Sequence, residues 1–72
     1  MSFAERIKTL RTERGVSQAQ VAEAVGIAWR NYQKIESQAS LPNYNTLLEI
    51  ANFFGVSVDY LMGRTDKREV NR

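Results

Sequence analysis

The sequence predicts an all-α fold, a compact bundle of five short helices. Apolar residues recur at intervals of three and four along most of the chain, which is the spacing of one helix face. Serine, asparagine and glycine residues that commonly begin or end helices bracket each of these segments. With 72 residues, of which 43% are hydrophobic, the chain has the size and composition of one small globular domain.

The first helix is predicted to run from Ser2, as its N-cap, to about Arg14. Gly15 follows, where a residue with positive φ commonly ends a helix. The face that this helix buries is expected to consist of Phe3, Ile7 and Leu10.

The stretch from Ser17 to Ile35 predicts two further helices of about two turns each, joined by a short turn. Ser17 and Gln20 have the spacing of a capping box, in which each side chain bonds the backbone N–H of the other. Gly26 follows the first of these helices. The apolar positions, which we expect to face the core, are Val21, Ala22 and Val25 in the first helix, and Ala28, Tyr32 and Ile35 in the second. Two short helices joined through a glycine are the pattern of a helix-turn-helix.

Two more helices are predicted in the second half of the chain. Asn43 is a suitable N-cap for a helix of about eleven residues, and Ser57 can cap a short fifth one that Gly63 closes. Their inward positions are expected to be Leu47, Ile50, Ala51, Phe54, Val58 and Leu61. Residues 1–63 would thus form the domain, and residues 64–72, polar apart from Val70, a frayed tail.

The composition argues against several classes of function. The chain has no cysteine and no histidine, which removes disulfides, the commonest zinc ligands and the usual general base. Its acidic residues are scattered, so we expect no catalytic site, metal or cofactor. No stretch reaches the roughly twenty apolar residues of a membrane span, and the N-terminus lacks a signal-peptide pattern. A cytoplasmic protein with no membrane contact is expected.

Charge is distributed unevenly along the chain. Residues 1–36 carry six basic and four acidic side chains, a balance of +2, whereas residues 37–63 carry two acidic side chains only. The last nine residues carry four basic and two acidic ones, again +2. This arrangement is compatible with binding to nucleic acid, although a solvated helix face explains the same charges about as well.

Many residues then match one known pattern at the correct spacing, over about residues 3–63. The sequence resembles the Cro/C1-type (Xre) helix-turn-helix family of phage repressors and bacterial regulators. The matching residues are Ile7, Leu10, Arg11, Gly15, Ser17, Gln18, Val21, Ala22, Gly26, Ile27, Ile35, Glu36, Pro42, Leu47, Ile50, Ala51 and the run from Gly55 to Gly63. The resemblance implies a five-helix bundle of the phage-repressor DNA-binding domain type, with the helix-turn-helix formed by its second and third helices.

The resemblance also implies a function. Members of this family bind operator DNA, typically as two-fold dimers, so we expect a sequence-specific regulator. A repressor acting as a homodimer on a pseudo-palindromic operator of double-stranded DNA is the first expectation, with no small-molecule ligand. The alternative is a protein-interaction module, such as an antitoxin or anti-repressor component, that uses the same fold.

Helical geometry leaves one face of the third helix free for base contacts. Arginine and lysine can donate to guanine, and glutamine can pair with adenine. A tryptophan can pack on a thymine methyl or donate to a phosphate. In the family, the positions of Trp29, Arg30, Gln33 and Lys34 supply the base contacts. The plainer alternative is a solvated face, with Trp29 half-buried against a neighbouring loop.

Other residues are expected to contact the DNA backbone. Gln18 lies in the first turn of its helix, beside free backbone N–H groups that suit a phosphate, and the matching family glutamine makes this contact. Ser17 and Asn43 are helix caps first and phosphate ligands second.

Two further sets have structural interpretations. The family pairs the positions of Arg11 and Glu36 in a partly buried salt bridge, which we expect here in place of a catalytic or binding role. Phe53, Tyr60 and Met62 remain after the core is assigned. They are candidates for a self-complementary dimer patch, or else half-buried core.

The sequence departs from the family pattern at three places. Ala28 stands where a capping serine or threonine is usual, and Gln38 where glycine is common. The loop from Ser37 to Leu41 has no lysine or arginine, so phosphate neutralisation should be weaker there. We therefore expect modest affinity per monomer and a larger contribution from dimer formation.

Overall fold

The computed structural model describes residues 2–68 and is all-α, as the sequence predicts. Met1 and residues 69–72, which include Val70 of the predicted tail, lie outside the described part. The helices are α1 (Phe3–Arg14), α2 (Gln18–Val25), α3 (Trp29–Glu36), α4 (Tyr44–Phe54) and α5 (Val58–Leu61). Within these residues, no helix is long and apolar enough to span a membrane.

The helix boundaries follow the capping signals of the sequence. Ser2 and Ser17 each form a capping box, with Glu5 and Gln20 respectively. The Asn43 side chain accepts a hydrogen bond from the Thr46 backbone N–H at 2.8 Å. These bonds satisfy N–H groups that a helix start leaves without partners, so local chemistry alone fixes where α1, α2 and α4 begin.

The N-terminus of α3 differs from the prediction. Ala28 is the N-cap residue and makes no side-chain hydrogen bond. It is exposed, so the prediction that it faces the core is wrong. The reason is that α3 begins at Trp29, which leaves Ala28 outside the helical period that places Tyr32 and Ile35 inward.

Gln38 replaces the expected glycine without changing the backbone that a glycine would favour. It has a φ of +68°, the one positive value outside glycine among the described residues. A non-glycine side chain in this left-handed region costs about 1 kcal/mol. The turn after α3 therefore carries backbone strain at Gln38.

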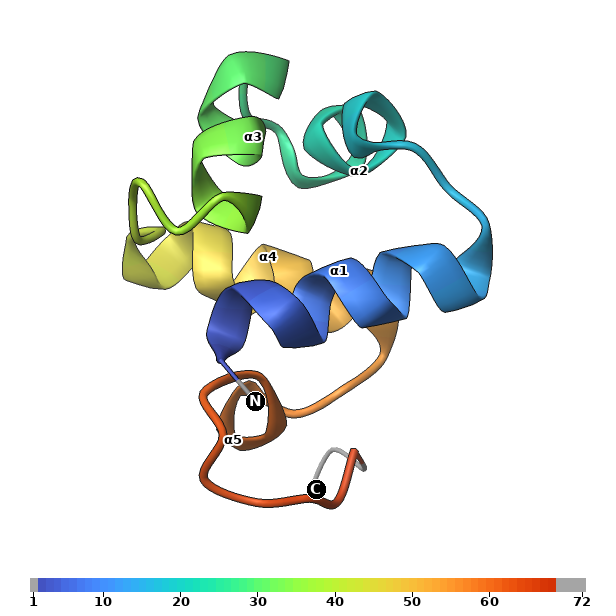
Figure 1. The fold of residues 1–72 in the computed structure, drawn as a ribbon, viewed down its shortest axis with the longest axis vertical. Coiled ribbons are helices and arrows are strands. Elements are labelled where there is room, and N and C mark those ends of the chain that lie inside the picture. The colour runs from blue at the N-terminus through green and yellow to red at the C-terminus, as the bar shows by residue number, and fades with distance from the viewer. Residues whose placement is uncertain (1, 69–72) are drawn as a thin grey trace.

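One core joins all five helices. In Figure 1, α2 and α3 occupy one end of the molecule, α1 and α4 cross its middle, and α5 lies at the other end. Each helix contributes one of the largest fully buried side chains: Ile7, Val21, Tyr32, Ile50 and Leu61. Helices of four to twelve residues are not stable alone in water, so each depends on this shared core.

Residues 64–68, expected to fray, instead fold back on α1. The Arg68 carbonyl accepts a hydrogen bond from the Ser57 backbone N–H at 2.9 Å. The guanidinium of Arg6 donates to the Thr65 carbonyl and to Asp66, both at 3.2 Å. Because Arg6 is buried, these acceptors satisfy a charge that would otherwise be poorly solvated.

Candidate nucleic-acid interface

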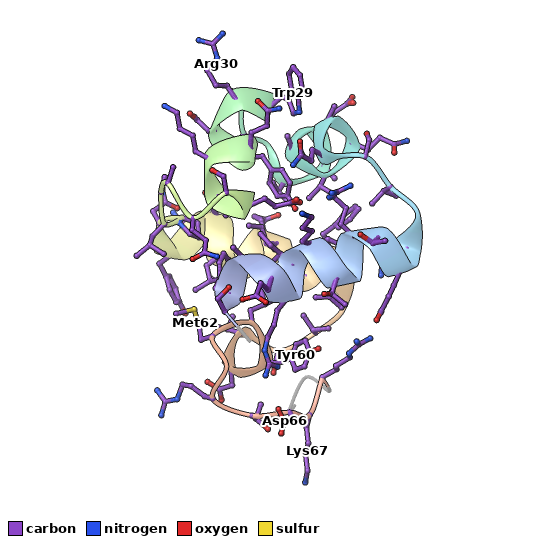
Figure 2. The ribbon with its side chains drawn as sticks, in the orientation of Figure 1. Trp29, Arg30, Tyr60, Met62, Asp66 and Lys67 are labelled. Carbon is purple, nitrogen blue, oxygen red and sulfur yellow. The ribbon has the colours of Figure 1, made fainter. Side chains whose placement is uncertain are left out.

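Helix α3 has one buried face and one free face. Tyr32 and Ile35 are buried, whereas Arg30 and Lys34 are exposed and Gln33 is half-buried. Trp29 is 55% exposed, which is compatible with a base contact and also with the alternative of a half-buried side chain. Figure 2 shows Trp29 and Arg30 projecting outward at the end of the molecule that α2 and α3 form. The four side chains predicted to contact bases therefore share one accessible helix surface.

The start of α2 lies against the end of α3. The Gln18 side-chain amide donates to Glu36 Oε1 at 3.1 Å, and Ser17 accepts the Gln20 backbone N–H through its hydroxyl at 3.1 Å. This places two of the residues predicted to contact the DNA backbone at one helix N-terminus, next to the end of α3. A helix N-terminus carries partial positive charge and unpaired N–H groups, which suit an anion.

Arg11 and Glu36 form an ion pair that ties α1 to α3. Arg11 Nε lies 2.7 Å from Glu36 Oε2, and Arg11 Nη2 donates to Oε1 at 3.2 Å. The third nitrogen, Nη1, donates to the Val16 carbonyl in the turn before α2 at 3.1 Å. The pair thus fixes the positions of three helices.

The donors around Glu36 determine its protonation. Burial alone would raise the pKa of Glu36. Hydrogen bonds that Arg11 and Gln18 donate to its carboxylate outweigh burial and hold the pKa below the ordinary value of 4.5. Burial also raises the pKa of Tyr32, and the neighbouring Glu36 carboxylate adds to that effect. At neutral pH, the carboxylate is charged and the phenol is neutral.

Asn43 lies beside a hollow between α3 and the loop that follows it. The hollow has a volume of about 330 Å³. Leu41, at its rim, is 83% exposed, and the loop brings no basic side chain. Its lining consists of Ile27, Asn31, Ile35, Ser40, Leu41, Pro42, Asn43 and Thr46. Any contact that this region makes with a phosphate would therefore come from neutral donors.

Three arginines of α1 bond to groups within the domain, and only the contact of Arg11 was predicted from the sequence. Besides Arg6 and Arg11, Arg14 donates to the backbone carbonyls of Phe53 and Phe54 and lies over both rings. These partners are 39 and 40 residues away in sequence, so no local pattern marks them. Most of the basic charge on α1 is therefore structural.

The three dimer candidates lie in different surroundings. Met62 is 49% exposed and Phe53 is half-buried. Tyr60 is buried, with the guanidinium of Arg6 4.4 Å from its ring centroid. Met62 is accessible to a partner, whereas Tyr60 is covered by the chain's own side chains.

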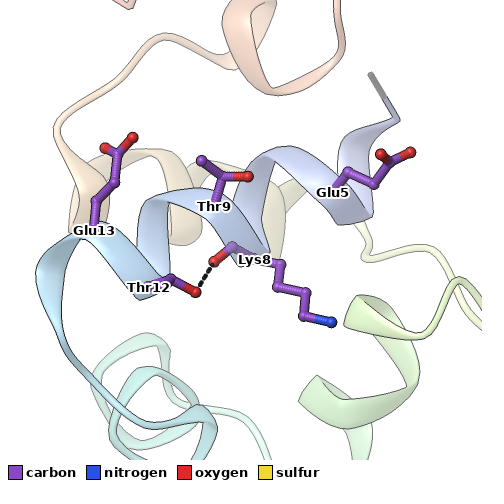
Figure 3. Close-up of a pocket in the computed structure, with 5 residues that line it drawn as sticks. All are labelled: Glu5, Lys8, Thr9, Thr12 and Glu13. Carbon is purple, nitrogen blue, oxygen red and sulfur yellow. Dashed lines mark hydrogen bonds between the residues drawn. The ribbon is translucent and has the colours of Figure 1, made fainter.

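Another hollow lies along the outer face of α1 (Figure 3) and has a volume of about 440 Å³. Its lining comes from one helix: Glu5, Lys8, Thr9, Thr12 and Glu13. Glu5 and Glu13 are eight positions apart, or about 12 Å along a helix axis. Two carboxylates at that separation on one solvated face do not form an acid–base pair.

Comparison with known proteins decides the family. A family model described as a helix-turn-helix domain matches residues 4–67. The chain belongs to the helix-turn-helix family. Within this family it is a Cro/C1-type regulator domain, since its relatives carry the names of transcriptional regulators and phage repressors.

Two relatives illustrate the helix-turn-helix match. The SPbeta prophage-derived uncharacterized transcriptional regulator YonR of Bacillus subtilis is 40% identical over 63 residues, covering 88% of this chain and 58% of the relative. The cryptic phage CTXphi transcriptional repressor RstR of Vibrio cholerae is 37% identical over 71 residues, covering 96% of this chain and 63% of RstR.

A solved structure shares the helix-turn-helix fold. The P22 c2 repressor, crystallised with a synthetic operator, superposes with a TM-score of 0.83 at 27% identity, covering 86% of this chain and 94% of that one. The chain thus spans about 60% of the length of the two curated relatives and nearly all of the P22 c2 repressor chain in that structure.

Proposed function

We propose that this chain is the DNA-binding module of a transcriptional repressor that recognises its operator through α3. The observation that carries the proposal is the free face of α3, where Trp29, Arg30 and Lys34 are exposed opposite a fully buried face. A helix with this division of faces can enter the major groove while its domain stays intact. The name of RstR and the operator in the P22 c2 complex support repression and DNA binding.

In this proposal, the side chains have separate roles. Arg30 and Lys34 donate to guanine, Gln33 pairs with adenine, and Trp29 packs against a thymine methyl or the sugar–phosphate backbone. Ser17, Gln18 and Asn43 hold the DNA backbone from the starts of α2 and α4. Such backbone contacts orient a protein on DNA without reading sequence.

We further propose a homodimer on a pseudo-palindromic operator. Two copies of α3 would enter successive major grooves about 34 Å apart. The dimer face would include Met62 and the half-buried Phe53, with Tyr60 beneath the surface. Because the loop after α3 has no basic residue, each monomer gains little from phosphate neutralisation and relies on its partner for affinity.

The test is selection of duplexes from a random pool, followed by sequencing, at two salt concentrations. An enriched inverted repeat, with affinity that falls as salt rises, is the expected result. Arg30→Ala and Lys34→Ala should abolish the enriched motif. Lys67→Ala is the matched control, because Lys67 lies at the far end of the molecule from Arg30 (Figure 2) and should change nothing.

Two outcomes would contradict the proposal. Weak binding without any motif, together with tight binding to a protein, would make the domain a protein-interaction module. A motif that survives both α3 substitutions would move base recognition to another element.

A further inference from the structure

We propose that Glu36 is a positioning residue for DNA: it orients the Gln18 side-chain amide toward a phosphate, while Arg11 offsets its charge. This inference rests on the proposed function and assigns Glu36 a part in it beyond the ion pair. The three residues come from three helices, α1, α2 and α3, and meet at the start of α2.

The chemistry of the contact fixes how the Gln18 amide is turned. Its nitrogen lies 3.1 Å from Glu36 Oε1. An ionised carboxylate has acceptors only, so the amide must present its nitrogen, not its oxygen, to Glu36. One of its two N–H groups is thereby used, and the other remains for an oxygen outside the protein.

The backbone adds donors at the same place. Within residues 2–68, the N–H groups of Gln18 and Ala19 have no hydrogen-bond acceptor. These are first-turn groups of α2, which a helix leaves open at its N-terminus. A phosphate oxygen there could accept from them and from the remaining amide N–H of Gln18.

A carboxylate so near a phosphate would repel it unless its charge were offset. Arg11 supplies the offset by donating to both carboxylate oxygens, at 2.7 and 3.2 Å. The same guanidinium also donates a hydrogen bond to the Val16 carbonyl, two residues before Gln18. The Arg11 side chain therefore fixes both the Glu36 carboxylate and the turn that leads into α2.

Burial restricts how Glu36 can affect DNA. Its side chain is only 3% exposed, so a duplex cannot contact it directly. An effect of Glu36 on affinity, separate from stability, must then pass through a residue that contacts Glu36 and reaches the surface. Arg11 and Gln18 are both partly exposed, and of the two only Gln18 lies in the first turn of α2, beside the N–H groups that could bind a phosphate.

The test is a double-mutant cycle on affinity for a mixed-sequence duplex at low salt, where phosphate contacts dominate. Gln18→Ala is measured in the wild type and in a background carrying Arg11→Met with Glu36→Met. An apolar pair of similar volume often replaces a buried ion pair without loss of stability, so this background removes the acceptor and leaves no unpaired charge.

Gln18→Ala should weaken binding about tenfold or more in the wild type, the size of one hydrogen bond to a charged group. It should weaken binding less than twofold in the methionine background. Arg30→Ala is the control, because the exposed Arg30 side chain does not contact Glu36. This substitution should weaken DNA binding by the same factor in the wild type and in the methionine background. If Gln18→Ala weakened DNA binding equally in both backgrounds, Glu36 would have a structural role only and the inference would be wrong.

If the methionine protein fails to fold, a measurement on the wild type tests whether Glu36 orients the Gln18 amide. The two Nε2 protons of Gln18 give separate NMR signals. On addition of the duplex, one should shift, and the one bonded to Glu36 should stay. Movement of neither or of both overturns the inference, while absence of any DNA binding overturns the proposed function itself.

Discussion

Arg68 and Glu13 form a bidentate ion pair across 55 residues of sequence, with Nη1–Oε1 and Nη2–Oε2 distances of 2.8 and 3.0 Å. The Arg68 guanidinium also lies over the ring of Tyr60, 5.4 Å from its centroid, while Arg6 lies over the same ring. Two arginines, one from α1 and one from the C-terminal segment, thus lie against the ring of Tyr60. Residues 64–68 are therefore part of the folded domain.

Removing residues 64–72 should lower the free energy of unfolding by about 2 kcal/mol, because the buried Arg6 loses its acceptors on Thr65 and Asp66. Urea unfolding at neutral pH measures this. Arg68→Ala, which removes only a half-exposed pair, should cost less than about 1 kcal/mol. If the two proteins were equally stable, the Arg6 contacts would be unimportant.

Arg11→Ala should lower the free energy of unfolding by about 3 kcal/mol, since it leaves the Glu36 carboxylate buried without its counter-charge. The measurement is thermal or urea unfolding at pH 7. An unchanged melting curve would show that the pair contributes nothing to stability. Arg30→Ala, on an exposed position of α3, serves as the control and should unfold like the wild type.

Stability should fall in acid through Glu36. Its pKa in the folded protein lies below the ordinary 4.5, so its contribution is fully present above pH 4.5 and is lost as pH falls through the lower folded value. Urea unfolding between pH 7 and pH 3 should show this loss. The protein with Arg11→Met and Glu36→Met should lose less stability over the same range, and parallel curves would exclude Glu36 as a cause.

Ala28→Ser should stabilise the domain by about 1 kcal/mol. Ala28 already has the extended backbone of an N-cap, with φ −66° and ψ 143°, but no side chain that can accept a hydrogen bond. A serine hydroxyl there would satisfy a first-turn N–H group of α3. Melting temperature is the readout, with Ala39→Ser, in the exposed loop after α3, as a control that should change little.

Gln38→Gly should also stabilise the protein, by about 0.5–1 kcal/mol. Glycine adopts the φ of +68° without the steric cost that Gln38 bears. The gain is limited because glycine also has more freedom in the unfolded chain. A loss of stability would indicate that the long 3.5 Å contact between the Gln38 amide and Ser2 Oγ is worth more than the strain.

Most of the fold could be predicted from the sequence, because local signals determine it. Ser2, Ser17 and Asn43 begin their helices where the capping patterns place them. The apolar spacing identified buried positions such as Ile50 and Leu61. The error at Ala28 arose one residue before a helix, where the helical period does not yet apply.

The arginines could not be assigned in this way. Arg6 and Arg14 have partners 39 to 60 residues away, and only tertiary packing brings these together. A count of basic residues treated them as available for DNA, whereas the fold uses them internally. The sequence leaves Tyr60 open between a dimer patch and half-buried core, whereas the fold buries it with Arg6 and Arg68 against its ring.

The long axis of the molecule has a practical consequence. Over Cα atoms the described chain extends 30 Å, with Arg30 at one end and Lys67 at the other (Figure 2). A fluorophore attached through Lys67→Cys, in a chain without other cysteines, would stand well clear of a duplex at α3. It could report tumbling of the free and DNA-loaded protein without touching the surface under study.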